Sequence, residues 1–508
     1  MVLSSHDIPL GGTDYLKHDL KGRSVRGSAI NLSGQSCKFI LNLGGTAILA
    51  RLLTPSDFGI LAMVMAVIGF VIFFRNLGLS MATVQREDIA NHQVNSLFWV
   101  NLGFSLVILL ISWAIAPGIA WVYGEPRLTH ITLIIATGFI FGGLMGQHQA
   151  LLHRYMRYKE LNIVETLSLL GAVVVGVFSA IRGWGYWSLV FKLLSEQFFL
   201  MAGMWLTCSW RPGRPTFFKG AGSLIQFGGN LAGVNILFYL MANLDKFLIG
   251  TFYGTKPLGF YSLAYQFLYL PIQQINFPFS RVALPALSRL QNDISTYRLY
   301  YRKALHFMVG ISWPLVVFLL VTADHVVQIF LGSQWLDSVI LFRLLGPAAL
   351  LGSLGAATRW VFVSLGQTDR QLRWTLLVTP ITFLGFGVGL FWGPVGVAAS
   401  LSITRILLWF PGIIYCFKTT PLKISDLGSA IWRPVVSSAL AAVVLLLLIG
   451  LDFNMGLGWK FVLEFFVFSI SYIIAWIALP GGKSKGKEIV QLIKELNVFT
   501  SKRDKNIS

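Results

Sequence analysis

The segment GSAINLSGQSCKFILNLGGTAILARL (Gly27–Leu52) decides the fold, because it has the length of a membrane-spanning helix but carries a lysine near its middle. On a helix of about 3.6 residues per turn, one narrow stripe carries four polar residues: Asn31, Gln35, Lys38 and Asn42. A charge near the bilayer centre costs about 3 kcal/mol or more, so this stripe cannot face lipid. We therefore expect Lys38 to face a watery space between helices. Pairing of Lys38 with a neighbouring helix for packing is the alternative, and it stays open.

The composition indicates a polytopic membrane protein. The chain has 508 residues, of which 55% are hydrophobic and 12% charged. Apolar runs of about 20 residues recur, and each is long enough to cross about 30 Å of hydrocarbon. The first 26 residues are polar and basic without an apolar core, so we expect no removable signal peptide.

We predict an all-α fold of about fourteen membrane-spanning helices. Their ranges are 27–52, 57–80, 94–117, 128–150, 161–182, 186–208, 223–252, 258–278, 303–322, 338–362, 374–392, 396–417, 434–451 and 460–479. The net charge of +19 falls mainly in every second connection, which is the positive-inside pattern and not the signature of nucleic-acid binding. Both termini are therefore predicted to be cytoplasmic. The amphipathic stretches Ser280–Leu305 and Glu488–Val498 predict interfacial helices on acidic headgroups, with partner binding as the alternative.

An internal repeat divides the predicted helices. Offsetting LLTPSDFGIL (Leu52–Leu61) by 200 residues aligns it with FYGTKPLGFY (Phe252–Tyr261) and superposes Gly59 on Gly259. Transporters are often built from two related halves around one site. The predicted parts are a cytoplasmic segment (1–26), a six-helix N-lobe (27–215), a six-helix C-lobe (216–418), two extra helices (419–480) and a basic cytoplasmic tail (481–508).

Ionisable residues inside the predicted spans define the candidate site. Lys38, Glu196 and Arg405 are expected near the midplane, and Lys192, Asp245, Lys246 and Arg343 in the outer half. The seventh span repeats the polar spacing of the first, so the candidate substrate-binding set also includes Asn31, Gln35, Asn42, Asn235 and Tyr239. Five positive charges against two negative ones predict a cationic lumen for an anionic group in transit.

Two simpler interpretations of these charges remain open. Lys192 and Glu196 are four residues apart on one helix, which also suits a local ion pair. Glu165 lies near the cytoplasmic face, where its side chain can reach water, so it is assigned no role.

Signatures of enzymatic chemistry are weak in this sequence. The stretch Gly481–Ser484 lacks the earlier glycine of a phosphate-binding loop, and we find no metal-binding motif, so we expect no cofactor. Cys37, Cys208 and Cys416 are far apart and are predicted to be packing residues. The predicted outer loops are short, the one around Asp324–Trp335 being among the longest, and this leaves little room for catalysis.

Four blocks of the sequence carry a family resemblance. They are ARLLTPSDFGILAM (Ala50–Met63), NLGLSMATVQRED (Asn76–Asp88), NLDKFLIGTFYGTKPLGFYSLAYQFLYLPIQQIN (Asn243–Asn276) and ALPALSRLQND (Ala283–Asp293). They resemble the polysaccharide transporter family of Wzx-type lipopolysaccharide or exopolysaccharide flippases, most closely its WzxC-like branch. That family belongs to the superfamily that includes multidrug MATE exporters and the lipid II flippase.

The resemblance implies a transporter of the bacterial cytoplasmic membrane that moves an undecaprenyl-diphosphate-linked oligosaccharide between leaflets for colanic-acid-like polysaccharide assembly. It places Asp245 and Lys246 in the family's Asp-Lys pair, and Arg51, Pro55, Gly59 and Gly259 in its outer turns. It also implies membrane lipids, a polymerase and export machinery as partners. The driving force is left open between membrane potential and an ion gradient. The alternatives are a lipid II-like or MATE-type transporter, a polymerase or ligase of the same pathway, and a non-transporting scaffold.

Overall fold

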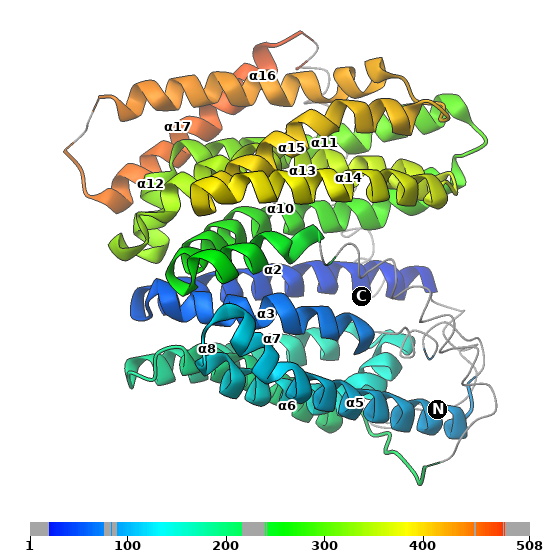
Figure 1. Cartoon of the computed structure of the whole chain (residues 1–508). Coiled ribbons are helices and arrows are strands. Elements are labelled where there is room, and N and C mark those ends of the chain that lie inside the picture. The colour runs from blue at the N-terminus through cyan, green and yellow to red at the C-terminus, as the bar shows by residue number, and fades with distance from the viewer. Residues whose placement is uncertain are drawn as a thin grey trace, which may run out of the picture. The chain divides into compact units, whose positions relative to one another are not determined.

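The computed structural model describes residues 20–75, 83, 89–215, 239, 241–451, 454–480 and 482, with side chains from residue 33 onward except at residues 70–75. Within these ranges all regular structure is helical, which confirms the predicted all-α fold (Figure 1). The elements are α2 (Leu20–Leu52), α3 (Pro55–Arg75), α5 (Asn91–Tyr123), α6 (Arg127–Arg154), α7 (Tyr158–Ile181), α8 (Trp187–Thr207), α10 (Thr255–Arg289), α11 (Ile294–Val321), α12 (Ala323–Val326), η1 (Val327–Leu331), η2 (Ser333–Trp335), α13 (Ser338–Ser364), α14 (Thr368–Gly389), η3 (Leu390–Trp392), α15 (Gly393–Phe417), α16 (Ile424–Ile449) and α17 (Leu457–Ala478).

The long helices are apolar enough to make this a multi-pass membrane protein. Nine helices of the described ranges qualify by length and composition as membrane spans, the run from Thr368 to Phe417 being taken as one. Helices suit a membrane because they satisfy their own backbone hydrogen bonds where hydrocarbon offers no partner. The predicted total of fourteen spans stays a prediction, since part of the range 223–252 lies outside the described residues.

The described residues form two compact units. The first comprises the residues up to Phe267 together with Phe330–Leu344 and Thr375–Thr404. The second comprises Leu268–Ile329, Leu345–Trp374 and the residues from Arg405 onward. This division follows the packing of the backbone and differs from the two predicted lobes, which stay a prediction.

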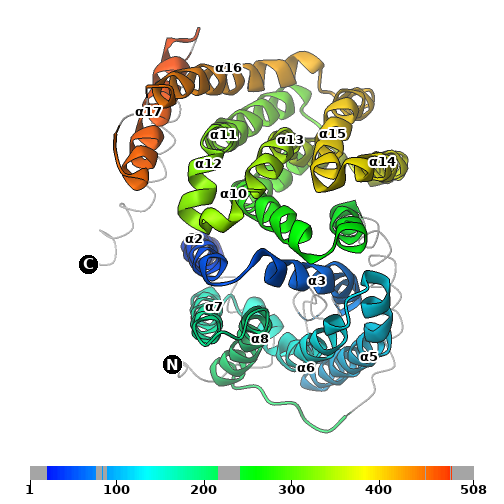
Figure 2. The same ribbon diagram turned by 60° about the vertical axis from the view of Figure 1, so that its left-hand side comes forward.

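In the first unit, α2 packs closely against α7 because two glycines of α2 leave room for side chains of α7. A Cβ atom added to Gly34 would lie 2.1 Å from Asn162 Oδ1, and one added to Gly45 would lie 2.6 Å from a methyl group of Val173. The helices α7 and α8 lie side by side beyond this contact, as do α5 and α6 (Figures 1 and 2). Small residues thus bring polar side chains of three different helices within reach of one another.

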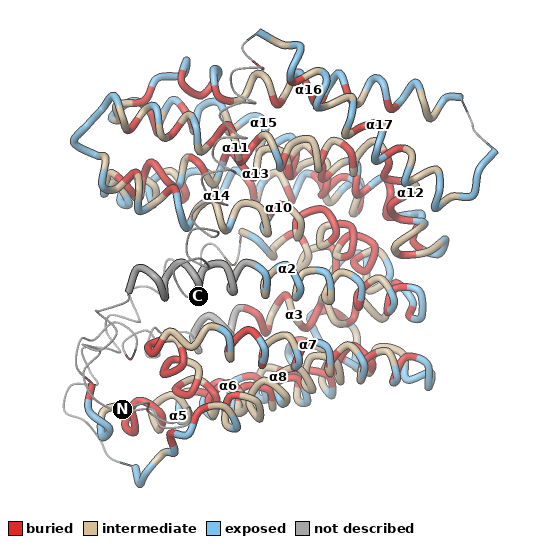
Figure 3. Tube along the Cα trace, turned by 180° about the vertical axis from the view of Figure 1, so that it is seen from behind, coloured by how far each residue is buried: buried red, intermediate tan, exposed pale blue. Residues whose placement is uncertain are grey.

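In the second unit, α16 is fixed to α11 by a buried carboxylate. Arg298 donates to both oxygens of Asp426, at 2.8 and 3.0 Å, and Asp426 is 2% exposed. On α17, Glu464 is hydrogen-bonded to His325 of α12 at 2.9 Å. The remaining faces of α16 and α17 are largely exposed or intermediate (Figure 3), as expected for helices that face lipid. The helices α16 and α17 are therefore held within the second unit by specific polar contacts.

The predicted interfacial helix Ser280–Leu305 is wrong as a single element. The helix α10 ends at Arg289 and α11 begins at Ile294, with a turn between them. Asp293 caps α11 by accepting hydrogen bonds from the side chain and backbone of Thr296 and from Ser295. These bonds lower the pKa of Asp293 to about 2. Because Asp293 caps the start of a new helix, the amphipathic stretch is divided between the end of α10 and the start of α11.

The repeated turns contact each other reciprocally within the first unit. A Cβ atom on Gly59 would lie 1.8 Å from the carbonyl oxygen of Thr255, and one on Gly259 would lie 1.9 Å from that of Pro55. The 200-residue offset that aligns Gly59 with Gly259 also aligns Pro55 with Thr255. The two halves of the repeat therefore meet through equivalent backbone atoms, and glycine is required because no side chain fits the gap.

We predict that Gly59→Ala lowers the midpoint of thermal unfolding of the purified protein, because overpacking against a rigid backbone costs about 1–3 kcal/mol. Gly103→Ala is the matched control, since nothing lies within 4 Å of a Cβ at this helical glycine. Relief of glycine flexibility should leave the control at or slightly above the parent. Equal midpoints for the two variants would contradict the close contact.

Candidate functional site

Lys38 on α2 pairs with Glu165 on α7. The Lys38 ammonium donates to Glu165 Oε2, and the two side chains are 17% and 24% exposed. The pair answers the question that the sequence raised, because a carboxylate of a neighbouring helix neutralises the lysine. Glu165, to which sequence analysis assigned no role, is therefore part of the candidate site.

One turn further along α2, Asn42 contacts α8. Lys192 Nζ lies 3.5 Å from Asn42 Oδ1 and donates a hydrogen bond to it. The stem of Lys192 passes Gly176 of α7, where an added Cβ would lie 3.0 Å from the Lys192 Cβ. The hydrogen bond of Lys192 thus runs to another helix, although sequence spacing also suited an ion pair with Glu196, which lies half-buried on α8.

We call Lys38, Asn42, Glu165 and Lys192 the polar row. It joins three helices, of which α7 and α8 qualify as membrane spans by length and composition, and it brings together two cations and one anion. Gln35 lies half-buried on α2, one turn before Lys38 and two turns before Asn42. Asn31 lies in α2 with its side chain outside the described residues. The row itself holds two cations and one anion, and Glu196 on α8 also interacts electrostatically with Lys192. Its two ammonium groups are the feature that could attract an anionic group.

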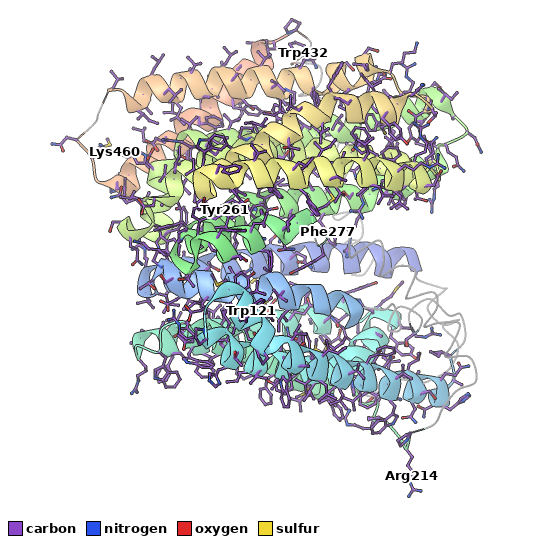
Figure 4. The ribbon with its side chains drawn as sticks, viewed as in Figure 1. Trp121, Arg214, Tyr261, Phe277, Trp432 and Lys460 are labelled. Carbon is purple, nitrogen blue, oxygen red and sulfur yellow. The ribbon has the colours of Figure 1, made fainter. Side chains whose placement is uncertain are left out.

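The described helix at residues 241–253 directs its adjacent Asp and Lys to different partners. Asp245 is 2% exposed and accepts from the hydroxyl of Tyr261 at 2.6 Å and from the backbone N–H of Lys246 at 2.8 Å. The ammonium of Lys246 donates to Asn243 Oδ1 at 3.1 Å and lies 4.7 Å from the ring centroid of Tyr265. Tyr261 extends from α10 (Figure 4). Asp245 thus joins two helices, whereas the ammonium of Lys246 contacts an amide and an aromatic ring.

The structure describes Tyr239 but not Asn235, the two other residues predicted in the seventh span. The hydroxyl of Tyr239 donates to the carbonyl oxygens of Met65 and Ala66 on α3, at 2.7 and 3.1 Å. An added Cβ at Gly69 would meet the same hydroxyl, so α3 is shaped to receive it. Asn235 lies outside the described residues. Tyr239 therefore contributes to the packing of α3.

The remaining predicted cations lie on α13 and α15. Arg343 is exposed on α13, in the first unit. Arg405 is half-buried on α15, in the second unit, and donates to the carbonyl oxygen of Ala348 at 3.2 Å and to the hydroxyl of Tyr269 at 3.3 Å. Its guanidinium also lies 5.7 Å from the ring centroid of Tyr269. Arg405 thus has a backbone carbonyl and a phenol among its hydrogen-bond acceptors.

Sequence analysis missed three partners of these charges, namely Glu165, Tyr261 and Tyr269. Each lies on a different helix from the charge that it contacts. Helical spacing predicts neighbours on the same helix only, so no signal in the single sequence identified them. Among the described residues, no group of three or more His, Cys, Asp or Glu side chains comes together as a metal site.

The fold is similar to those of solved membrane transporters. It matches the lipid II flippase MurJ in an inward closed conformation with a TM-score of 0.73 at 15% identity, covering 88% of this chain and 98% of that one. It matches an inward-facing multidrug resistance MATE family transporter of the MOP superfamily with a TM-score of 0.56 at 14% identity, covering 75% and 94%. The chain therefore shares the fold of these two transporters.

The sequence places the chain within a family. It belongs to the family described as Polysaccharide biosynthesis protein, whose profile matches residues 48–340. Lipopolysaccharide biosynthesis protein WzxC of Escherichia coli (strain K12) is 23% identical over 377 residues, or 72% of this chain and 75% of that protein. Succinoglycan biosynthesis transport protein ExoT of Rhizobium meliloti (strain 1021) is 23% identical over 432 residues, or 83% and 85%.

We predict that Lys38 and Glu165 are energetically coupled. Glu165→Leu leaves the lysine without its carboxylate and Lys38→Met leaves the carboxylate alone, so each single variant should lower the midpoint of thermal unfolding. The double variant should recover most of the loss, with a coupling free energy of about 1–3 kcal/mol. A double-mutant cycle on the purified protein measures this coupling, and strictly additive effects would count against the ion pair.

Proposed function

We propose that this protein is a flippase that moves an undecaprenyl-diphosphate-linked oligosaccharide from the inner to the outer leaflet of the bacterial cytoplasmic membrane. The observation that carries the proposal is the polar row, in which Lys38 is paired with Glu165 and Lys192 donates to the neutral side chain of Asn42. A diphosphate needs positive partners to enter a membrane. The family and the shared fold supply the context, since the matched relatives include proteins of lipopolysaccharide and succinoglycan biosynthesis.

The charges suggest how such a substrate binds. Lys38 and Lys192 already have partners, so a diphosphate competes with Glu165 for Lys38 and with Asn42 for Lys192. Each lysine therefore has a partner both before and after the substrate binds. In this proposal Lys246 and the exposed Arg343 supply further positive charge in the first unit, and Arg405 supplies it in the second. The sugar occupies the polar lumen while the prenyl chain stays in lipid. The proposed site also includes the remaining predicted residues, namely Asn31, Gln35, Glu196, Asn235, Tyr239 and Asp245.

Transport proceeds by alternating access. The two repeats rock so that the lumen opens first to the cytoplasm and then to the outer face. Both termini are cytoplasmic in this proposal, and the turns at Gly59 and Gly259 belong to the outer end. The driving force is the membrane potential or an ion gradient. A polymerase and export machinery take up the flipped glycan for a colanic-acid-like or related polysaccharide.

The enzyme-class alternative is a polymerase or ligase of the same pathway. Reconstitution separates the two activities: purified protein is placed in liposomes with a fluorescent prenyl-diphosphate-linked disaccharide, and a membrane-impermeant quencher reports its leaflet. We expect the label to change leaflet with its glycan unaltered. A lengthened or transferred glycan without a change of leaflet would defeat the flippase proposal. A MATE-type exporter would instead move organic cations and leave this probe in place.

We predict that Lys38→Ala and Arg405→Ala each reduce surface polysaccharide by about tenfold or more, because a charge-assisted contact worth about 1.5–3 kcal/mol is lost. Output is measured in cells whose own copy of the gene is deleted, with membrane insertion checked by immunoblot. Lys38→Arg should retain most of the output because it keeps the charge. Lys159→Ala, an exposed lysine of α7, is the control that should remain at the parent level. Full output from both alanine variants would refute the cationic path.

A further inference from the structure

Trp335 is wedged between the two repeated turns. It belongs to η2, in the connection between α12 and α13, and is completely buried. Phe58 packs edge-on against its ring at a centroid distance of 5.3 Å, and Phe260 does so at 5.8 Å. These phenylalanines adjoin Gly59 and Gly259, the residues of the reciprocal backbone contact. The indole ring of Trp335 thus packs against a residue from each of the two repeated turns.

The same connection caps the end of α2. Trp335 Nε1 donates to the carbonyl oxygen of Ala50 at 2.8 Å, and Gln334 Nε2 donates to those of Ala50 and Leu53 at 2.6 and 3.0 Å. Carbonyls in the last turn of a helix lack partners within the helix. The Ala50 carbonyl is available because the N–H of Thr54, four residues on, donates to Asp57 instead. The partners of α2 thus come from a segment 284 residues away in the chain.

The backbone of this segment is built for the contact. Gly332 precedes η2 with φ of 103°, which side-chain-bearing residues rarely adopt. Ser338, the first residue of α13, donates to the carbonyl oxygen of Trp335 at 2.6 Å. The positions of Gln334 and Trp335 are therefore set by a glycine on one side and by a long helix on the other.

The repeat itself does not need this segment. In the first repeat the chain passes from α5 to α6 through residues 124–126, whereas the equivalent passage from α11 to α13 in the second repeat takes residues 322–337. Both passages join two consecutive long helices. The extra residues of the second repeat are those that carry Gln334 and Trp335, so the addition serves the contact between the turns.

We propose that Gln334 and Trp335 form a latch that holds the turn between α2 and α3 against the start of α10 and so keeps this end of the transporter closed. The inference rests on the proposed alternating access, which requires the two turns to separate. Separation withdraws Trp335 from Phe58 and Phe260 and breaks the three hydrogen bonds to α2 together. The latch therefore makes outer opening a concerted step.

A cysteine reporter at Leu53 tests the latch in the full-length protein. Leu53, whose carbonyl oxygen accepts from Gln334, is 3% exposed and lies in one apolar cluster with Phe58. Cys37, Cys208 and Cys416 are first replaced by serine or alanine. Intact cells carrying Leu53→Cys are treated with a membrane-impermeant maleimide. Trp335→Ala should raise the labelling rate by about tenfold, the shift expected when about 1.4 kcal/mol of closure is lost. The matched control, Trp392→Ala, removes an exposed tryptophan and should not change the rate.

Two further variants keep the test decisive if Trp335→Ala fails to insert. Trp335→Phe retains the ring and loses the indole N–H, and Gln334→Leu removes the amide that caps α2, so each should raise the labelling rate by a smaller factor. Unchanged labelling of Leu53→Cys in both correctly inserted variants would overturn the latch. That outcome leaves the proposed function untouched, because it concerns only how the end is closed.

A crosslink distinguishes the latch from the proposed function. Gln334→Cys with Leu53→Cys is joined by a short cleavable bifunctional maleimide, and surface polysaccharide is measured before and after cleavage of the linker. Arrested output that recovers on cleavage supports both proposals. The other informative result is normal polysaccharide output from fully crosslinked protein. Together with raised labelling in the latch variants, it would support the closing role of Gln334 and Trp335. It would also defeat alternating access and favour a scaffold.

Discussion

Hydrocarbon provides no hydrogen-bond partner and solvates no charge, and the rest of this structure depends on that constraint. The described backbone inside the spans is helical, so its own N–H and C=O groups are paired. Intramembrane charges then need partners from side chains or carbonyls. Lys38 finds a carboxylate, Lys246 an amide and an aromatic ring, and Arg405 a carbonyl and a phenol. The more completely a partner neutralises a cation, the less binding free energy an incoming anion gains from that cation.

This graded neutralisation suits transport better than permanent binding. The ion pair with Glu165 stabilises Lys38 in the empty protein, and in the proposed function a diphosphate would take over the lysine by displacing Glu165. Cations beside neutral groups keep more of their field and attract an anion over a longer range. A transporter must bind and then release its substrate, so partial compensation lowers the barrier to release. The proposed path uses both kinds of cation.

Close backbone contacts carry the mechanical part of the proposal. Gly59 and Gly259 let the two repeats meet through carbonyl oxygens, with no side chains between them. Contacts of this kind depend strongly on distance and form or break as a unit. The latch residue Trp335 adds buried aromatic area to the same place, and Gln334 completes the end of α2. Closure at this end thus combines a symmetric contact from the repeat with an asymmetric addition from one half.

The sequence by itself determined that the chain is an all-α membrane protein and that Gly59 and Gly259 occupy equivalent positions. It also predicted which residues place charge inside the membrane. Those conclusions follow from hydropathy, repeat offset and helical spacing, which are local properties of the chain. Tertiary structure decided the partners: Glu165 for Lys38, Asn42 for Lys192, and the last turn of α2 for Gln334. It also divided Ser280–Leu305 into two helix ends. The physical reason is that periodicity fixes which residues share a face of one helix, whereas the meeting of two faces depends on how helices pack in three dimensions.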